Sequence, residues 1–481
     1  MFVNFYINMH FIRPYNPIIA KRILSIAYPI IFANASRSIM GIVDMIMVGK
    51  LGVHSMAAVG FGEMLIFSLI AIVGCSIQIS TQTITSRRYG EKDFPKCFET
   101  LINGLTIGIC LGLPIMIIGY IYCDNLIQIF LDDPITIKEC IKYTSIQFLG
   151  ILFPIMFYIF QGFYTGIQKT SIFSKIAIFS NVINIYLNLG LIFGSDNIHS
   201  YFASSIVPGF NKLGILWHIF PFPQMGIAGA ALGTIIAMGL SLLCFLVYLF
   251  SNEIRQNFTF TKIGIKFSLI KKQIKLTWPV MQTNASMFFG LTLFLVIMGK
   301  IGTIELAATN IMIRIYNVSC MPAIGIGNAC SSLVGYYLGE KNLDKTFICI
   351  KDSLRYALLI MGTFAISWFI IPDFILSLFT QDSQLKEVGI PLLRFLAIIS
   401  ILDSSNVVCM STLEGAGDVK FVSRITHVYV WIIYIPLSYL VGIYLGIGLW
   451  GAWNSFLFGF LFLSSMLYYR IYKGEWQSIS V

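Results

Sequence analysis

The stretch GKLGVHSMAA (residues 49–58) returns as GKIGTIELAA (residues 299–308), in each case directly after a long apolar run. Further matches occur in the same order: Pro29 with NAS at 34–36 and Pro279 with NAS at 284–286, YGEKD at 89–93 and LGEKN at 338–342, Phe130 with Asp133 and Phe379 with Asp382, and GIAGAA at 226–231 and GLWGAW at 448–453. All but the last pair are separated by 249 or 250 residues. The pattern indicates an internal duplication.

The duplication sets the expected domain organisation. We predict an N-terminal lobe at residues 1–250, a basic cytoplasmic linker at 251–273 and a C-terminal lobe at 274–481. The last matching pair is only 222 residues apart, because residues 195–224 are inserted in the first half. Prolines in this insert break helices. We therefore expect it to lie on the outer surface without forming an additional span, with its WHIFPF group (217–222) at the lipid interface.

The composition is typical of a membrane protein. Of the 481 residues, 57% are hydrophobic and 11% are charged, and the mean hydropathy is +0.82, whereas soluble proteins carry about 25% charged residues. The apolar runs predict twelve transmembrane helices, six in each half: 23–48, 56–86, 98–122, 140–163, 173–194, 225–250, 274–299, 306–336, 347–371, 389–413, 420–443 and 448–469. Because six is even, both halves have the same topology, and alternating access can occur in a cleft between them.

The basic residues predict the orientation. When basic residues in the ends of helices are counted with the neighbouring loop, 23 of the 32 Lys and Arg residues fall at the termini and the even-to-odd loops, six fall at the opposite loops, and Arg37, Arg314 and Arg394 lie within helices. By the positive-inside rule, both termini face the cytoplasm, and we expect a multi-pass protein of the plasma (inner) membrane. The net charge of +10 then reflects loops near anionic lipid rather than a nucleic-acid partner.

The sequence shows no motif of an enzyme. It lacks a nucleophile elbow, a P-loop and a dinucleotide fingerprint, so we expect neither catalysis nor ATP hydrolysis, and an ion gradient must supply the driving energy. The ten cysteines and five histidines show no metal-ligand spacing. We therefore expect small buried cysteines, and no cofactor besides Na⁺ or H⁺ as the coupling ion.

One carboxylate lies inside the first predicted helix. Asp44 stands in GIVDMIMVGKLG (41–52), and the repeat places Phe294 at the corresponding position. An ionised side chain deep in a bilayer costs about 2.5 kcal/mol or more, so it normally faces a cavity or a partner. Two interpretations remain open. Asp44 carries a cation for transport, or it neutralises Arg37, which is seven residues earlier on the same helical face.

The fifth predicted helix carries a polar stripe. Asn181, Asn184 and Asn188 follow an i, i+3, i+7 pattern, which places them on one helical face. Hydrogen bonding between helices is one interpretation. The other is a site for a monovalent cation, since neutral amide oxygens beside one carboxylate suit such an ion better than zinc. The second half has Val, Ile and Leu near the corresponding positions, so the stripe belongs to one lobe alone.

The ordered motifs resemble those of the multidrug and toxic compound extrusion (MATE) family of cation-coupled antiporters. The residues that carry the resemblance are GIVDMIMVGKLG (41–52), RRYGEKD (87–93), TGIQKT (165–170), NVINIYLNLGLIFG (181–194), GIAGAALGT (226–234), LVGYYLGEKN (333–342) and DSSNVVCMSTLEGAGD (403–418). The resemblance implies an all-α integral membrane protein whose two homologous six-helix bundles form a V-shaped central cavity. It also implies export of organic cations and other amphipathic toxins, driven by inward Na⁺ or H⁺.

Carried over residue by residue, the resemblance also implies a site. The cation-coupling residues would be Asp44, Asn184, Asn188, Thr234 and Asp403. If the coupling ion is Na⁺, the first four would be its ligands. One departure is Met287 in the seventh helix, where many members of the family carry Glu.

Further polar residues carry more than one interpretation. One interpretation of Asp403 is that it takes part in coupling. The other is a structural role, in which it caps a helix or forms an ion pair with Arg394 or Arg314. The candidates for the substrate cavity are Gln78, Gln82, Asn181 and Arg37. We expect Glu63 to be solvated, because it lies near an outer helix end.

The sequence thus predicts a secondary active transporter that exports organic cations, drugs or toxic metabolites in exchange for Na⁺ or H⁺. Its expected partners are a small amphipathic or cationic substrate and membrane lipid, and we expect a monomer. The alternative is a lipid-linked saccharide or lipid flippase of a related duplicated-bundle fold. Such a flippase would be expected to line its cavity with several cations for pyrophosphate, whereas only three arginines, Arg37, Arg314 and Arg394, lie in the outer halves of the predicted helices.

Overall fold

The computed structural model describes residues 13–203, 217, 221–251 and 266–480, and this part of the chain contains helices and no strand. The helices of the first half are α2 (Pro17–Gly49), α3 (Val53–Gly90), α4 (Phe94–Ile121), α5 (Cys123–Phe130), α6 (Pro134–Gly150), α7 (Leu152–Gly166), α8 (Thr170–Phe193), α9 (Ser195–Ala203) and α12 (Ile227–Leu249). The predicted all-α class is confirmed.

The second half repeats this layout. Its helices are α14 (Phe267–Ile301), α15 (Thr303–Ser319), α16 (Met321–Gly339), α17 (Leu343–Ile370), α18 (Pro372–Ser377), α19 (Ser383–Ala416), α20 (Val419–His427), the π-helical η1 (Val428–Tyr434), α21 (Ile435–Tyr439), the π-helical η2 (Leu440–Tyr444), α22 (Leu449–Lys473) and the 3₁₀ turn η3 (Glu475–Ser478).

Each of the twelve predicted helices has a counterpart. Within the described residues, nine continuous stretches are long and apolar enough to cross a membrane, and two bent pairs add a span each: α6 with α7 (47°) and α15 with α16 (46°). Pro154 in α7 and Pro322 in α16 follow the two bends closely, as expected of a residue that lacks the N–H and clashes with the preceding turn. The twelfth counterpart is α19, which carries charged residues along its length.

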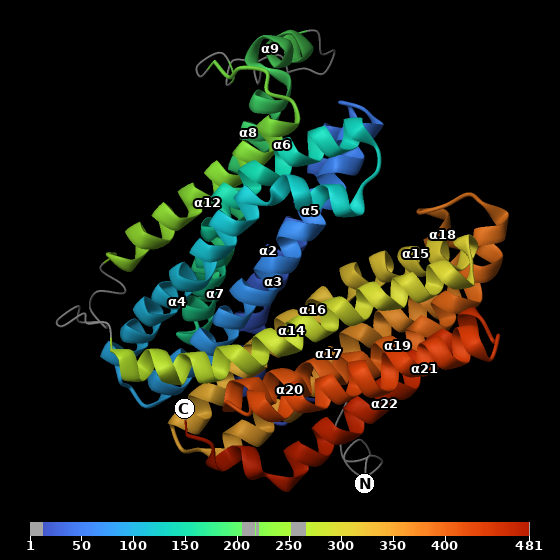
Figure 1. Ribbon diagram of the computed structural model, residues 1–481. Coiled ribbons are helices and arrows are strands. Elements are labelled where there is room, and N and C mark those ends of the chain that lie inside the picture. Colours follow the sequence, from blue (N-terminus) through green and yellow to red (C-terminus); the bar gives the residue numbers. More distant parts are fainter. Residues whose placement is uncertain (1–12, 204–216, 218–220, 252–265, 481) are drawn as a thin grey trace.

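The structure differs from the prediction in two segments, the linker and the insert. α14 begins at Phe267, inside the predicted linker, most of which (252–265) lies outside the described residues. The insert begins with the nine-residue α9 at the tip of the first bundle (Figure 1), and this helix is too short to span a bilayer. Residues 204–216 and 218–220 of the insert are not described. Trp217 is 5% exposed and donates its Nε1 hydrogen to the Tyr186 carbonyl over 3.0 Å, so this ring packs against α8 and is not at the lipid interface as we expected.

Two hydrophobic cores define two lobes. One core joins buried residues of α3, α4, α6, α7, α8 and α12, and the other joins those of α15, α16, α17, α19 and α22. Figure 1 shows the two bundles as the arms of a V, with α5 and α9 at the tip of one arm and α15 and α18 at the tip of the other. The predicted architecture of two six-helix bundles in a V is confirmed.

The first helix of each half passes from one lobe to the other. The beginning of α2, from Ile19 to Ile30, is buried in the core of the C-terminal lobe, whereas Met47 near its end is buried in the N-terminal core. α14 does the reverse, since Ile270 packs against the N-terminal core and Phe294 lies in the C-terminal one. The repeated prolines, Pro29 and Pro279, lie inside these helices near the crossing.

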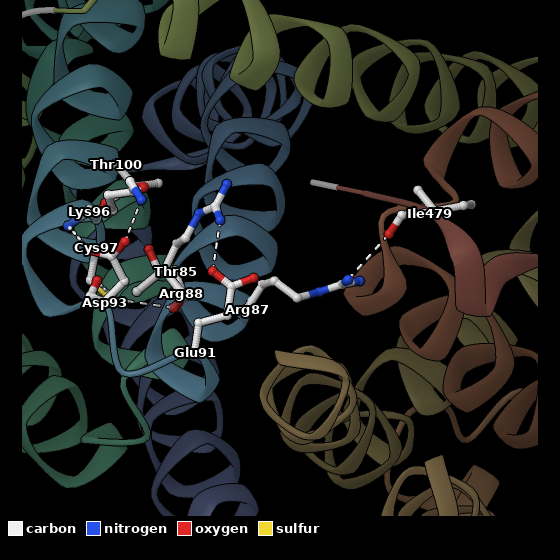
Figure 2. Close-up of polar contacts among 9 residues, drawn as sticks. All are labelled: Thr85, Arg87, Arg88, Glu91, Asp93, Lys96, Cys97, Thr100 and Ile479. Atoms are coloured by element: carbon white, nitrogen blue, oxygen red, sulfur yellow. Dashed lines mark hydrogen bonds and ion pairs between the residues drawn. The ribbon is translucent and has the colours of Figure 1, made fainter. Parts of the chain in front are cut away.

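The lobes are held together at one end. The Gln82 amide donates to the Asn328 carbonyl over 2.9 Å, and the Thr83 hydroxyl donates to the Glu414 carbonyl over 2.9 Å. Arg87 reaches across to the C-terminal lobe, where it donates to the carbonyls of Ala416 (3.1 Å) and Ile479 (3.2 Å); Figure 2 shows the contact with Ile479. This closed end carries the basic loops that predict the cytoplasmic side.

Candidate functional site

Asp44 lies near the end of α2, in the part of that helix that belongs to the N-terminal lobe. Its Oδ1 accepts a hydrogen bond of 2.7 Å from Nδ2 of Asn188 on α8. Asp44 is half-buried and Asn188 is only 1% exposed. The predicted association of the helix 1 carboxylate with the polar stripe of the fifth helix is therefore present in the structure.

The polar stripe continues to α12. Nδ2 of Asn188 also donates to Oδ1 of Asn184 over 3.2 Å, and Nδ2 of Asn184 donates to the Thr234 hydroxyl over 3.2 Å. α8 and α12 approach closely here because Gly233 has no side chain, and a Cβ at this position would collide with Oδ1 of Asn188. A carboxylate, two amides and a hydroxyl from three helices thus form one connected group.

This group borders a small cavity. The cavity has a volume of about 140 Å³, and its polar lining comes from Asp44, Asn188, Thr234, Glu63, Tyr143 and Gln147. Sites for drug-sized ligands have volumes of about 300–1,000 Å³, whereas a water molecule takes about 30 Å³. The cavity therefore has the size for a cation with a few waters and not for an organic drug.

The amide of Asn188 has one unused acceptor. Its Nδ2 makes both hydrogen bonds described above, while its buried Oδ1 has no hydrogen-bond partner among the described residues. A neutral amide rarely buries an acceptor without a partner, because the loss of hydration is not recovered. Rotation of this amide by half a turn would present an oxygen to a cation held by Asp44.

Arg37 does not pair with Asp44. Its guanidinium donates to the Tyr158 hydroxyl on α7 over 2.5 Å and lies 5.2 Å from the Tyr158 ring centroid and 5.7 Å from that of Phe157. No ion pair of Arg37 occurs within the described part of the chain. The interpretation that Asp44 exists to neutralise Arg37 is therefore not supported by the geometry.

The other candidate residues lie apart from the cavity. Asn181 donates to the Ser36 hydroxyl over 2.8 Å and joins α8 to α2. Gln78 and Gln82 are buried in α3, 6% and 2% exposed, and Gln82 belongs to the contact between the lobes. The structure thus places these residues at helix contacts in and around the N-terminal lobe.

Asp403 belongs to the other lobe. It is 8% exposed on α19 and accepts a hydrogen bond from the hydroxyl of Tyr316 on α15. Neither Arg314 nor Arg394 forms an ion pair with it among the described residues. Tyr316 borders a second cavity, of about 120 Å³, whose lining is almost entirely apolar. The structure therefore does not bring Asp403 together with Asp44.

Three polar residues that line the Asp44 cavity were not among the predicted site residues. Glu63 comes from α3, and Tyr143 and Gln147 come from α6, where the Gln147 amide donates to the Tyr143 hydroxyl over 3.0 Å. The repeat contained a signal for them. Glu63 corresponds to Ile313 and Gln147 to Leu396 in the second half, so both polar residues belong to one lobe alone, as Asp44 does.

All ten cysteines are free, seven of them buried. No group of three or more His, Cys, Asp or Glu side chains that could hold a metal ion occurs among the described residues. The oxygen ligands around Asp44 are the kind that bind Na⁺ or carry H⁺, and they are poorly suited to a transition metal.

Comparison with known proteins agrees with this geometry. The family profile MatE matches residues 29–189 and 279–440, one match in each half. The chain is 23% identical to the probable multidrug resistance protein NorM of Thermotoga maritima, over 97% of this chain and 95% of that protein. It is 25% identical to the multidrug resistance protein NorM of Photobacterium profundum, over 95% of this chain and 96% of that protein.

A solved structure shares the fold. It is described as the outward-facing conformation of a multidrug resistance MATE family transporter of the MOP superfamily. The two structures superpose with a TM-score of 0.82 over 96% of this chain and 97% of that one, at 19% sequence identity. Since both halves match the family profile in order, the chain belongs to the MatE family, a family of multi-pass membrane transporters and not of enzymes.

Proposed function

We propose that this protein is a secondary active transporter that exports small organic cations and other amphipathic compounds in exchange for Na⁺ or H⁺. The observation that supports this most directly is the position of Asp44, a carboxylate in a small and partly polar cavity inside one membrane-crossing lobe, with amide and hydroxyl groups of Asn188 and Thr234 around it. A carboxylate at this depth is costly unless it meets a cation.

The ligand chemistry favours a monovalent ion. Asp44 supplies one charge and two hard oxygens, and the neutral oxygens of Asn184, Asn188 and Thr234 can complete a Na⁺ site without adding charge. The same carboxylate can carry a proton instead. In either case the bound cation removes the charge of Asp44 and with it the cost of moving this part of the lobe past apolar surface.

Coupling requires two conformations with different ion affinities. In the structure the lobes are joined at the end of α3 by Arg87 and its neighbours and diverge toward α9 and α18 (Figure 1). With both termini in the cytoplasm, as the basic loops predict, this is the form open to the outside. A cation that binds this form better than the inward-open one shifts the equilibrium by the difference in its binding free energies.

The substrate class rests on the relatives and on the size of the cavity at Asp44. The two NorM proteins are named for multidrug resistance, and that name supports export of diverse small molecules here. The cavity at Asp44 is too small for such a molecule, so we place the substrate between the lobes and the ion at Asp44. We propose further that the protein acts as a monomer in the plasma (inner) membrane.

The flippase alternative fits the observed charges less well. A pyrophosphate would need several convergent cations, yet Arg37, Arg314 and Arg394 lie on three different helices, α2, α15 and α19. The guanidinium of Arg37 contacts aromatic rings of its own lobe, and that of Arg394 lies over Phe369.

The proposal is tested in proteoliposomes loaded with the fluorescent cation ethidium. A Na⁺ gradient at constant pH and a pH gradient at constant Na⁺ are imposed separately. We expect one of the two to drive ethidium transport by the full-length protein, and Asp44→Asn to abolish the driven component while ethidium binding in detergent persists. Equal transport with and without either gradient would contradict ion coupling.

A further inference from the structure

Glu63 is the second carboxylate of the Asp44 cavity. It lies on α3, which begins at Val53, and its side chain lines the cavity together with Asp44. Whereas most of the lining is buried, Glu63 is exposed. The side chain therefore stands at the mouth of the cavity, with Asp44 farther in.

Glu63 has no partner among the described residues, neither a hydrogen bond nor an ion pair. Some acidic residues near helix ends have partners, such as Asp93, which contacts Lys96 over 2.5 Å, and Glu139, which contacts Lys142 over 3.2 Å, whereas Glu305 in the first turn of α15 has none among the described residues either. An unpaired ionisable residue in a membrane-crossing helix indicates a functional site more often than a structural one.

Solvation at an outer helix end is the simpler explanation, and it was our expectation from the sequence. Two observations weigh against it. The repeat places Ile313 at the corresponding position, and Ile313 lines the corresponding cavity of the other lobe, so this helix end has no general need for a carboxylate. Asn188, which is 99% buried and lines the same cavity, has an acceptor oxygen without a partner among the described residues; this oxygen faces Gly233, and rotation of the amide by half a turn would bring it to a cation held by Asp44, an indication that does not depend on Glu63.

We propose that Glu63 captures the coupling cation at the outer mouth of the cavity and raises its concentration beside Asp44. The inference rests on the proposed function and adds a residue to it. Glu63 supplies negative charge, and Asn188, which is neutral, completes the inner site with Asp44. A unit charge within several ångströms attracts a cation appreciably even in a medium of high dielectric constant, and more strongly when the mouth is partly screened from water.

The other groups around the mouth do not replace this charge. The titratable groups that line the cavity besides Glu63 are Asp44 from α2 and Tyr143 from α6. α8 and α12 contribute Asn188 and Thr234, which do not titrate. Removing the charge of Glu63 should therefore weaken ion capture while leaving the inner ligands in place.

The test compares the ion dependence of ethidium transport in proteoliposomes containing the full-length protein. For whichever ion drives transport, the half-saturating concentration is measured for the wild type, Glu63→Gln, Glu63→Asp and the matched control Glu305→Gln. Glu305 is an acidic residue in the first turn of α15, at the outer end of the other lobe. We expect Glu63→Gln to raise the half-saturating ion concentration about tenfold at an unchanged maximal rate. Glu63→Asp and Glu305→Gln should stay within about threefold of the wild type.

The outcomes separate the two proposals. If Asp44→Asn abolishes driven transport and Glu63→Gln has the ion dependence of the wild type, Glu63 is not a capture residue and the coupling proposal stands. A loss of maximal rate at saturating ion in Glu63→Gln also overturns the capture role. If Asp44→Asn still shows driven transport, the proposed function itself fails. Because Glu63 is exposed, its substitution should leave folding intact, which the melting temperature in detergent verifies.

Discussion

In the N-terminal lobe, a cavity of about 140 Å³ lies among helices that carry carboxylates, amides and a hydroxyl. In the C-terminal lobe, a cavity of about 120 Å³ lies among the corresponding helices and has an almost entirely apolar lining of aliphatic and aromatic side chains. The repeat relates several positions of the two linings: Glu63 and Ile313, Ile66 and Tyr316, Phe67 and Asn317, Gln147 and Leu396, Thr234 and Phe456, and Met238 and Phe460. Phe294, at the repeat position of Asp44, does not line the second cavity but contacts the rings of Trp453 and Phe456, which do. The duplication preserved the helix arrangement, and under our proposal divergence confined the ion chemistry to one lobe.

In the second lobe, aromatic packing occupies the place that corresponds to the proposed ion site. The ring of Phe294 is 2% exposed and lies 5.2 Å from Tyr434, 5.7 Å from Trp453 and 6.1 Å from Phe456, centroid to centroid. Such ring pairs contribute about 0.5–1.5 kcal/mol each beyond the burial of their area. This lobe gains stability where the other accepts the cost of a buried carboxylate.

The largest effect is expected from placing the ion-site residue in the wrong lobe. Phe294→Asp should destabilise the protein by about 3–5 kcal/mol, because it leaves an uncompensated charge in an apolar core. Thermal unfolding in detergent measures this, with Phe294→Leu as the control at about 1 kcal/mol. If Phe294→Asp were as stable as the wild type and bound Na⁺, the second lobe would retain a latent ion site and the contrast between the lobes would be wrong.

The next effect concerns the amide beside Asp44. Asn188→Leu removes a hydrogen bond to a charged group, worth about 1.5–3 kcal/mol, together with a neutral oxygen. We expect driven ethidium transport to fall at least tenfold, whereas Asn188→Asp, which keeps the oxygens, should retain it. Leu437→Ala, near the corresponding position of the second lobe, serves as the control and should leave the ion dependence unchanged. Normal ion dependence in Asn188→Leu would remove Asn188 from the site.

The smallest effect is expected at Arg37. Because its guanidinium contacts Tyr158 and Phe157 and forms no ion pair with Asp44, Arg37→Ala should change the half-saturating ion concentration by no more than about threefold. The double variant Arg37→Ala with Asp44→Asn should remain without driven transport. Recovery of transport in the double variant would show that Asp44 serves only to neutralise Arg37.

Much of the fold could be predicted from the sequence, because length and apolar composition determine whether a segment crosses a bilayer. The duplicated motifs located the two lobes, and the asymmetry between Asp44 and Phe294 pointed to the polar cavity lining at which we propose the ion site. The crossing of α2 and α14 between the lobes was not predicted, since residues such as Ile23 are equally apolar in either core.

The details of the site depended on neighbours that a helical period does not reveal. Arg37 and Asp44 share a helical face, but seven residues are separated by about 10 Å along the axis, and Tyr158 of another helix contacts the guanidinium first. We expected Glu63 to be solvated because the sequence places it near a helix end. The sequence did not show that this side of α3 faces the cavity at Asp44 of α2. Its partner in the repeat, Ile313, was the available signal.

The central claim is that one lobe alone couples the ion, and the most direct test is a matched pair of substitutions at one repeat position. Asp44→Asn and Phe294→Leu are reconstituted in parallel, and ethidium transport is measured with the driving ion gradient and without it. We predict that Asp44→Asn loses the gradient-dependent component entirely, while Phe294→Leu keeps it at the half-saturating ion concentration of the wild type. Gradient-dependent transport by Asp44→Asn, or its loss in a folded Phe294→Leu, would contradict the account.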